Sequence, residues 1–555
     1  MKSADWLQKF SSALERGDIN GAAGMFEPDG FWRDLVAFTW NIKTCEGRAE
    51  IKAMLAARLA DVKPRNFQPK GEWFTFETEV GRGVGHLRLR GKHAWTLLTT
   101  LQELKGFEEK RENGSTPENR NPYVVIVGGG QGGIALAARL KRLNVPALVL
   151  EKNERAGDSW RKRYKALCLH DPVWYDHMPY LPFPDHWPVF SPKDRIADWL
   201  EMYVKVMGIE YWTNAACRRA RFDEATGEWE VLVMRDGQPL TLRPTHLVLA
   251  TGMSGFPQFP SIPGSFNGTS VHSSQYKDGA AWKDKQCVVV GSGTSAHDIC
   301  ADLVQNGAAE VTMVQRAPTI VARTQTLMDL AWGPLYSEEA VARGISTQIA
   351  DLTVASLPFR VLAELQKPIY QAMRERDADL YEGLGKAGFL YDFGEDGSGI
   401  HSLYLRRGAG YYIETGASKM IIERRIKLKS GVNVESLEEK SLRLSDGGAL
   451  PADLVVFATG YGSMTQWAKE LISQEVADKV GKVWGLGSET KADPGPWVGE
   501  LRNMWKPTQQ PNLWFHGGNL MQSRHYSLYL ALQLKARLEG IPTPVYYLEP
   551  VHHKE

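Results

Sequence analysis

The sequence predicts an α/β protein with two doubly wound units, each built on a parallel sheet, and a smaller α+β unit before them. Two observations predict the doubly wound units: an apolar strand, a glycine-rich loop and a helix follow one another at residues 123–140, and again at 286–303. The third observation is N-terminal. Trp6, Phe10 and Leu14 recur at helical spacing, and a run of strand-like segments follows before residue 108.

The composition is that of a globular protein and excludes several functional classes. Of 555 residues, 43% are hydrophobic and 24% are charged, and the formal net charge is +1. Neither a nucleic acid nor a membrane is therefore expected as a partner. The five cysteines form no C-x-x-C pair, so no metal site or dithiol centre is expected. Sparse cysteines and the lack of an apolar N-terminal signal predict a cytoplasmic location.

The first glycine-rich loop has the features of a dinucleotide site. Gly128, Gly130 and Gly133 form G-x-G-x-x-G between an apolar strand and a helix. Such glycines permit a tight turn, let backbone N–H groups reach a pyrophosphate and allow close helix–strand packing. Glu151 ends the next strand, about 20 residues on, where a carboxylate can accept hydrogen bonds from ribose hydroxyls. This order favours a nucleotide site over a glycine-rich turn without a ligand.

The segment after Glu151, EKNERAGDSWRKRY, favours FAD as the ligand of the first unit. In flavoproteins with two dinucleotide domains, a short loop at this place lies along the flavin. Ser159, Trp160 and Arg161 are therefore predicted to bind the cofactor. The alternative for Trp160 is an ordinary core residue.

The second glycine-rich loop predicts a separate site for NADPH. The strand after it ends in Arg316 instead of an acid. Because arginine suits a 2′-phosphate, this favours NADPH over NADH, and a surface arginine on a solvated loop is the alternative. The loop residues expected to contact the cofactor are Gly291, Ser292, Gly293, Thr294, Ser295 and Ala296.

Two further strands end in Ala-Thr-Gly, one with Thr251 and Gly252 and the other with Thr459 and Gly460. A Thr-Gly end lets the chain turn close to a cofactor and cross between domains, so all four residues are predicted to bind cofactor. Two dinucleotide-binding (Rossmann-like) domains in one chain imply electron flow from NADPH to FAD. The predicted parts are an N-terminal unit (1–108), a linker (109–121), an FAD domain (122–260 and 456–555) and an NADPH domain (261–455) with a helical insertion at about 325–400.

The stretch between the first Ala-Thr-Gly and the second glycine loop carries a fingerprint, with Phe266, Gly268, His272 and Tyr276 in the pattern F-x-G-x-x-x-H-x-x-x-Y. With these motifs in this order, the chain resembles the class B flavin-dependent monooxygenases of the flavin-containing monooxygenase superfamily. That group includes plant auxin-forming and Baeyer–Villiger enzymes. Tyr276 stands where Baeyer–Villiger members usually carry Trp. Together with residues 167–185, it places the chain nearer the auxin-forming and N,S-oxygenating branch.

The resemblance implies an enzyme that uses NADPH and O2 to oxygenate a small organic substrate through a C4a-(hydro)peroxyflavin. The reaction is N- or S-oxidation, or oxidative decarboxylation of a 2-oxo acid. The resemblance also implies that His272 and Tyr276 are catalytic residues. The alternative for His272 is a hydrogen-bonded structural role. Arg407 resembles the Baeyer–Villiger arginine. A Baeyer–Villiger enzyme that converts ketones to esters is the first rival function, and a non-oxygenating FAD reductase or oxidase is the second.

Three regions have less specific predictions. Gln522 lies where a C-terminal helix is expected to begin near the flavin, and it is predicted to bind the cofactor. The insertion is amphipathic, and a substrate lid, core packing and a dimer surface are all compatible with it. The N-terminal unit resembles nuclear transport factor 2-like (SnoaL-like) cone folds, with Asp34 as a polar cone residue. A structural or homodimerising role is favoured there over ligand binding, and a ligand-binding protein with a degenerate flavin part is the non-enzyme alternative.

Overall fold

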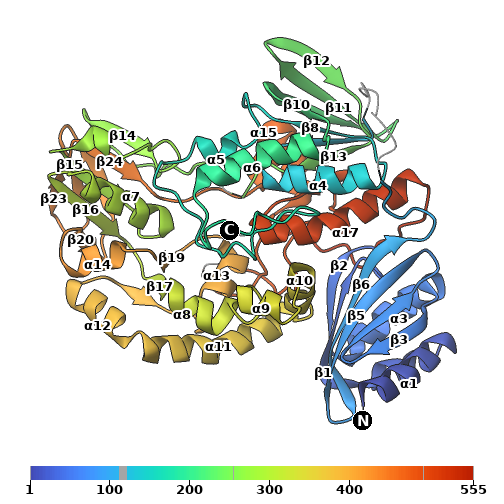
Figure 1. Ribbon diagram of the computed structural model, residues 1–555. Coiled ribbons are helices and arrows are strands. Elements are labelled where there is room, and N and C mark those ends of the chain that lie inside the picture. Colours follow the sequence, from blue (N-terminus) through green and yellow to red (C-terminus); the bar gives the residue numbers. More distant parts are fainter. Residues whose placement is uncertain (1, 112–121, 254, 492, 554–555) are drawn as a thin grey trace.

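The computed structural model describes residues 2–111, 122–253, 255–491 and 493–553, and its elements form a mixed α/β fold with several parallel sheets (Figure 1). Most of the predicted linker, residues 112–121, lies outside the described residues. The N-terminal unit, blue in Figure 1, lies beside the C-terminal helix α17 (Leu520–Leu538), drawn in red. Helix α17 packs against strand β6 of that unit, so the two ends of the chain lie together.

The N-terminal unit is a six-stranded mixed sheet with helices against it, in the order β2-β1-β6-β5-β4-β3. Trp6 stacks on Phe10 with ring centroids 4.6 Å apart, and aromatic side chains fill much of the core. The sequence placed strands only after the helices, but β1 and β2 lie between helices. The buried pattern of β1 does not alternate, so a period-2 signal was absent. The elements are α1 (Ser3–Glu15), α2 (Ile19–Gly24), β1 (Phe26–Leu35), β2 (Ile42–Glu46), α3 (Gly47–Val62), β3 (Arg65–Lys70), β4 (Trp73–Glu77), β5 (Gly81–Arg90) and β6 (His93–Leu104).

The first doubly wound unit has a five-stranded parallel sheet in the order β25-β13-β7-β8-β9. Its central strand β7 is fully buried, as the apolar run at its position predicts. Strand β25 comes from near the C-terminus, so the unit is assembled from two distant parts of the chain. The elements are β7 (Val124–Val127), α4 (Gln131–Arg142), β8 (Ala147–Leu150), α5 (Asp158–Arg161), α6 (Lys193–Val206), β9 (Tyr211–Trp212), β13 (His246–Leu249) and β25 (Leu513–Phe515), with an antiparallel sheet of β10 (Ala215–Asp223), β11 (Glu228–Arg235) and β12 (Gln238–Leu242).

The second doubly wound unit repeats this plan with a parallel sheet in the order β14-β24-β15-β16-β20. Helix α7 follows the second glycine loop and packs on β15 and β16. The elements are β14 (Thr269–His272), η1 (Ala280–Trp282), β15 (Gln286–Val290), α7 (Thr294–Gln305), β16 (Glu310–Gln315), α14 (Ala417–Ile422), β20 (Lys427–Ser430) and β24 (Leu454–Phe457), with an antiparallel sheet of β21 (Val434–Glu438), β22 (Ser441–Leu444) and β23 (Ala449–Pro451). The next two helices, α15 (Thr465–Leu471) and α16 (Gln474–Val480), pack with the core of the first unit, where α15 contacts β10.

A mainly helical segment is inserted between β16 and α14 and lies along the lower edge of the second unit in Figure 1. Helix α11 has a continuous apolar side that packs on α13, which is how an amphipathic helix covers a core. Among the described residues, none of the helices combines the length and apolar character needed to span a membrane. The segment comprises β17 (Thr319–Arg323), α8 (Thr324–Leu327), a π-helix (Met328–Trp332), α9 (Glu338–Ala342), α10 (Thr347–Ala355), α11 (Phe359–Arg376), α12 (Ala378–Ala387), β18 (Tyr391–Asp392), α13 (Gly399–Arg407) and β19 (Tyr411–Glu414).

Candidate active site

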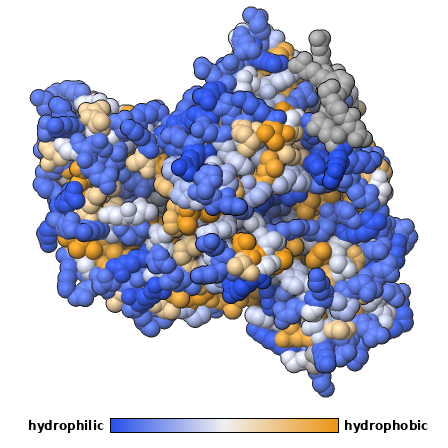
Figure 2. All heavy atoms as spheres, viewed as in Figure 1, coloured by the Kyte–Doolittle hydropathy of each residue, from blue (hydrophilic) through white to orange (hydrophobic). Residues whose placement is uncertain are grey.

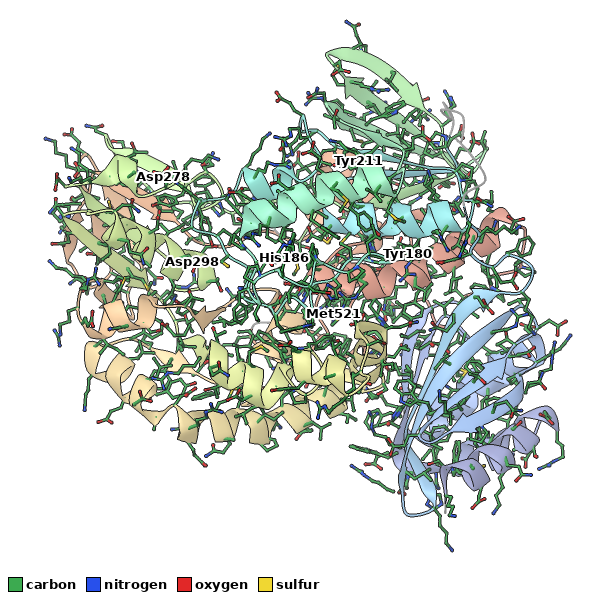
Figure 3. The ribbon with its side chains drawn as sticks, in the orientation of Figure 1. Tyr180, His186, Tyr211, Asp278, Asp298 and Met521 are labelled. Carbon is green, nitrogen blue, oxygen red and sulfur yellow. The ribbon has the colours of Figure 1, made fainter. Side chains whose placement is uncertain are left out.

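One cavity of about 1550 Å³ lies where the two doubly wound units and the inserted helices meet. Both glycine-rich loops and both Thr-Gly strand ends line it. In Figure 3, Met521 on α17 and Asp298 on α7 mark the two units that face each other across the middle of the molecule. Figure 2 shows a mostly hydrophilic surface with small groups of hydrophobic residues spread over it, some of them in the middle of the molecule. The predicted nucleotide loops therefore share a single space.

The first glycine loop leaves no room for side chains and presents free backbone donors. Gly128 has φ +111°, and a Cβ there would lie 2.3 Å from the carbonyl oxygen of Ala250. A Cβ on Gly133 would lie 2.0 Å from the carbonyl oxygen of Gly128. Gly130 precedes helix α4 as its N-cap and has no side chain to cap it, so the first N–H groups of the helix are open to an anionic ligand. This geometry fits a pyrophosphate.

Glu151 fixes the first loop and also lines the cavity. Its Oε2 accepts a hydrogen bond from the backbone N–H of Gly129 at 3.0 Å, and its Oε1 accepts two from Asn153. The hydroxyl of Tyr211, labelled in Figure 3, donates to the carbonyl oxygen of Gly129 at 2.8 Å. Since a carboxylate oxygen has two lone-pair directions, Oε2 retains one for a ribose hydroxyl.

Helix α5 brings only part of the predicted flavin loop to the cavity. Ser159 and Trp160 line it, and the Trp160 indole N–H donates to the side-chain oxygen of Gln131 at 3.3 Å. Arg161 is outside the lining. Its guanidinium donates to Asp198 and Glu201 of α6, both at 2.8 Å, so it joins α5 to α6. The side chain of Arg161 does not line the cavity, and its predicted role in binding the cofactor stays a prediction.

The second glycine loop has the same construction as the first. Gly291 has φ +128°, and a Cβ there would lie 2.3 Å from the carbonyl oxygen of Ala458. Helix α7 begins at Gly293, again without a side-chain cap. The remaining predicted loop residues all line the cavity: Ser292, Thr294, Ser295 and Ala296.

Two arginines stand together at the second loop. Arg316 follows β16, and Arg407 ends α13; both line the cavity. Burial lowers the pKa of Arg407, and the like charge of Arg316 lowers it further. Among the described residues, neither guanidinium forms an ion pair. The structure thus places Arg407 beside the predicted 2′-phosphate arginine, a position that the sequence did not indicate.

Both Thr-Gly ends line the cavity, and the segment that follows the first one is hydrogen-bonded to the second. Thr459 donates from Oγ1 to the carbonyl oxygen of Gln258 at 2.6 Å, and the Gly460 carbonyl accepts the backbone N–H of Gln258 at 3.1 Å. Thr251 is different, because its Oγ1 is buried and has no hydrogen-bond partner among the described residues. A buried hydroxyl without a partner costs free energy, so this atom fits a polar group of a bound cofactor.

His272 and Tyr276 are not part of the cavity lining. The backbone N–H of Ser274 donates to Nδ1 of His272 at 3.1 Å, so Nε2 carries the proton and donates to the carbonyl oxygen of Gly460 at 3.0 Å. Burial lowers the pKa of His272. The hydroxyl of Tyr276 donates to Asp302 of α7 at 2.7 Å. Both side chains hold the fingerprint stretch against the second unit, and a catalytic role for either stays a prediction.

Gln522 closes the N-terminus of α17 instead of lining the cavity. It forms a capping box with Asn519, and its Oε1 accepts the hydroxyl of Tyr404 at 2.9 Å. The cavity is lined there by Asn519, Leu520 and Met521. The sequence indicated the correct helix end. The side chain of Gln522 caps that helix together with Asn519, and it therefore does not line the cavity.

Sequence reasoning missed two carboxyl groups in the cavity wall, Asp171 and Asp176. They lie in the segment HDPVWYD, between α5 and α6, and the carboxyl Oδ2 of Asp176 is buried without a partner among the described residues. The only available signal was two acids in a mainly apolar and aromatic stretch, within residues 167–185, which carry part of the family resemblance.

Residues 151–334 match the family model described as flavin-binding monooxygenase-like. The chain is 29% identical over 382 residues to indole-3-pyruvate monooxygenase YUCCA1 of Oryza sativa subsp. japonica. The aligned region covers 66% of this chain and 86% of that relative. These findings support a flavin monooxygenase. The predicted enzyme class is thereby confirmed, and neither the Baeyer–Villiger nor the non-oxygenating alternative is favoured.

Solved structures share the fold. The OTEMO complex with FAD and NADP (form 3) has a TM-score of 0.53 at 18% identity, over 76% of this chain and 85% of that chain. Cyclohexanone monooxygenase bound to ε-caprolactone, in the Loose conformation, has a TM-score of 0.53 at 15% identity, over 76% and 88%. These structures show the shared fold, and the match to the flavin-binding monooxygenase-like family together with the two loops described above supports FAD and NADPH as the cofactors, as predicted.

Proposed function

We propose that the protein binds FAD at the first glycine loop and NADPH at the second, and oxygenates a small organic substrate that enters the same cavity. The observation that carries this proposal is the shared cavity, which both uncapped helix N-termini face. When bound, NADPH would supply hydride to FAD, and the reduced flavin would supply the electrons that activate O2. The reaction is N- or S-oxidation, or decarboxylation of a 2-oxo acid.

The chain's own residues bind and orient. The N–H groups at the start of α4 and α7 are proposed to hold the two pyrophosphates, and Thr251 to hydrogen-bond the flavin cofactor. Arg316 and Arg407 together are proposed to bind the 2′-phosphate of NADPH, because two unpaired guanidinium groups suit a dianion. This assigns Arg407 to cofactor selection in place of the Baeyer–Villiger arginine.

The inserted helices are proposed to form the substrate wall. Their side chains in the cavity are mostly apolar or aromatic, and such a wall excludes water, which would otherwise divert reducing equivalents to peroxide. The residues that support this proposal are Leu327, Ala331, Trp332, Leu335, Val354 and Leu362.

The N-terminal unit is proposed to be a SnoaL-like domain with a structural role, in a cytoplasmic protein. Its contacts with the insertion support that role. Arg88 donates to the carbonyl oxygen and the hydroxyl of Ser356 at 3.1 and 2.8 Å, and Arg360 donates to Glu46 at 3.0 Å. A homodimer through this unit is the second arrangement to test, by light scattering.

The test of the proposed function is a balance of NADPH, O2 and product in the purified protein. We expect bound flavin, reduction by NADPH in preference to NADH, and incorporation of one atom of ¹⁸O2 into an added amine, thioether or 2-oxo acid. Flavin that is reduced and then reoxidised with peroxide as the sole oxygen product, for every substrate tried, would contradict the proposal.

A further inference from the structure

The substrate side of the cavity carries a pair of carboxyl groups. Asp171 is 18% exposed and lies 4.0 Å from Nε2 of His170. Asp176 is only 2% exposed, and its Oδ2 has no hydrogen-bond partner among the described residues. Burial raises the pKa of both carboxyl groups, and the charge of Asp171 raises that of Asp176 further. A buried acceptor left without a donor points to a ligand that supplies one.

The guanidinium of Arg524, which acts electrostatically on Asp176, already has all its hydrogen-bond partners within the protein. Arg524 donates two hydrogen bonds to Asp351, at 2.8 and 2.7 Å, and further bonds to the carbonyl oxygens of Tyr175 and His177. Its charge lowers the pKa of Asp176, but burial dominates. Arg524 is also outside the cavity lining, so it is not available to a substrate carboxylate.

The other charged groups that line the cavity belong to the cofactor loops. His401, which lines the substrate side, is neutral at physiological pH because burial lowers its pKa to about 4. A substrate carboxylate placed beside Asp171 and Asp176 would face two acids, and the one imidazole beside them in the described lining, that of His170, already lies 4.0 Å from Asp171. In the described part of the lining, the lysines and arginines are Lys152, Lys162, Arg163, Arg316 and Arg407.

The aromatic part of the same wall suits an organic cation. Tyr175 packs edge-on against Tyr336, with ring centroids 4.9 Å apart, and lies 6.4 Å from Trp332. All three line the same cavity as the carboxyl pair. Aromatic faces attract ammonium groups, most strongly where water is excluded.

We propose that the carboxyl pair selects a basic amine as the substrate and that Asp171 removes its proton. This rests on the proposed monooxygenase function. The amine arrives as an ammonium ion; its N–H bond breaks, an O–H bond forms on the Asp171 carboxylate, and the lone pair remains on nitrogen. That lone pair then forms the N–O bond. With NADPH as reductant and one proton, one oxygen atom of O2 enters the N-oxide and the other leaves as water. Asp176 positions the charge of Asp171.

The raised pKa of Asp171 supports this step, because a weaker acid is a better proton acceptor at physiological pH. In a cavity of low polarity, the neutral amine and neutral acid are also favoured over the ion pair, since separated charges lose their hydration. A thioether has a free lone pair without deprotonation, so its oxygenation does not need Asp171.

The test compares substrates that share one ring. N,N-dimethyltryptamine, indole-3-pyruvate and 3-(2-methylthioethyl)indole are supplied in turn to the wild-type holoenzyme, to Asp171→Asn and to a matched control, Asp185→Asn, which changes an exposed acid in the same segment. Oxygenated product and NADPH consumed are measured for each pair, with flavin content as the check on folding.

We expect the wild type to convert the amine at least about 10-fold faster than the 2-oxo acid, and Asp171→Asn to lower the amine-to-thioether ratio at least about 10-fold. Asp185→Asn should keep the wild-type ratio. Faster conversion of indole-3-pyruvate, or equal losses on amine and thioether in Asp171→Asn, would overturn the inference while leaving the monooxygenase function intact. Absence of oxygenated product from all three compounds would instead contradict the proposed function.

Discussion

Charged side chains are buried in two regions of this molecule, and the regions differ in whether those charges have partners. At the junction of the N-terminal unit, Arg33 and Glu500 are each 1% exposed and form two hydrogen bonds at 2.7 and 2.8 Å. Arg33 also donates to the carbonyl oxygen of Ala355 and to the hydroxyl of Tyr526. In the cavity, by contrast, Asp176 and Thr251 have buried oxygen atoms without a partner.

Whether a buried polar group has a partner distinguishes groups that stabilise the fold from groups that can bind a ligand. A buried ion pair whose donors and acceptors are all used holds two units in one arrangement and has nothing left for a ligand. Unused polar atoms on a cavity wall are costly until a ligand satisfies them. Changes at the junction should therefore act on stability, and changes at the cavity on binding.

The largest expected effect is the loss of the flavin on changing Gly128 to Ala. The new Cβ would lie 2.3 Å from a backbone carbonyl, and φ at this position is +111°. Flavin content after purification should fall below about a tenth of the wild-type value, measured by absorbance. Gly227→Ala is the control, since Gly227 also has positive φ but no atom within 4 Å of the new Cβ. Full flavin content in Gly128→Ala would break the assignment of the first loop.

Removing Arg33 tests the junction. Arg33→Ala leaves Glu500 buried without a counter-charge, which should cost about 3–5 kcal/mol in the free energy of unfolding. Urea unfolding measures it, and bound cofactor should be retained in the folded fraction. Arg82→Ala, which removes an exposed ion pair with Glu103, should leave the unfolding midpoint nearly unchanged. Equal midpoints for the two variants would show that the junction does not stabilise the fold.

The pH dependence of the free energy of unfolding tests a buried group whose hydrogen bonds are made and which is held neutral, the imidazole of His246. His246 accepts the Trp514 indole N–H at Nδ1, at 3.2 Å, and burial lowers its pKa from 6.5 to about 3. The unfolded chain takes up a proton below pH 6.5 and the folded chain does not, so this stability is present above pH 6.5 and is lost as pH falls toward 3. The loss should be about 2 kcal/mol at pH 5.

Replacing this histidine isolates its share of the acid sensitivity. His246→Gln should unfold with a shallower pH dependence than the wild type between pH 7 and 5. His93→Gln, at a half-exposed position, should keep the wild-type dependence. A steeper slope for His246→Gln would mean that the ring is not held neutral in the fold.

The smallest expected effect belongs to Arg316. Arg316→Ala should weaken binding of NADP⁺ about 10-fold in an equilibrium titration and leave NAD⁺ nearly unchanged, because only the former carries the 2′-phosphate. The control is Arg243→Ala, which removes an exposed ion pair with Glu230 on another sheet. Equal losses for both nucleotides would place Arg316 elsewhere than at the 2′-phosphate.

The sequence predicted the strand–loop–helix units of this fold well, because each unit is formed by consecutive residues. Strand, glycine loop and helix are one continuous signal in both doubly wound units. The partners of single side chains were out of reach, because they come from distant segments: Arg161 reaches α6, and Gln522 caps its own helix. Asp171 and Asp176 were missed since isolated acids carry no periodic signal.

The central claim is that one cavity serves a flavin, NADPH and O2, and a single rapid-mixing experiment tests it most directly. The purified protein is reduced with NADPH without oxygen and then mixed with oxygenated buffer while the absorbance is followed. The account predicts bleaching by NADPH, followed by a species lasting seconds or longer that absorbs to the blue of oxidised flavin. Immediate return to the oxidised spectrum with release of peroxide, both with and without an amine, would contradict it.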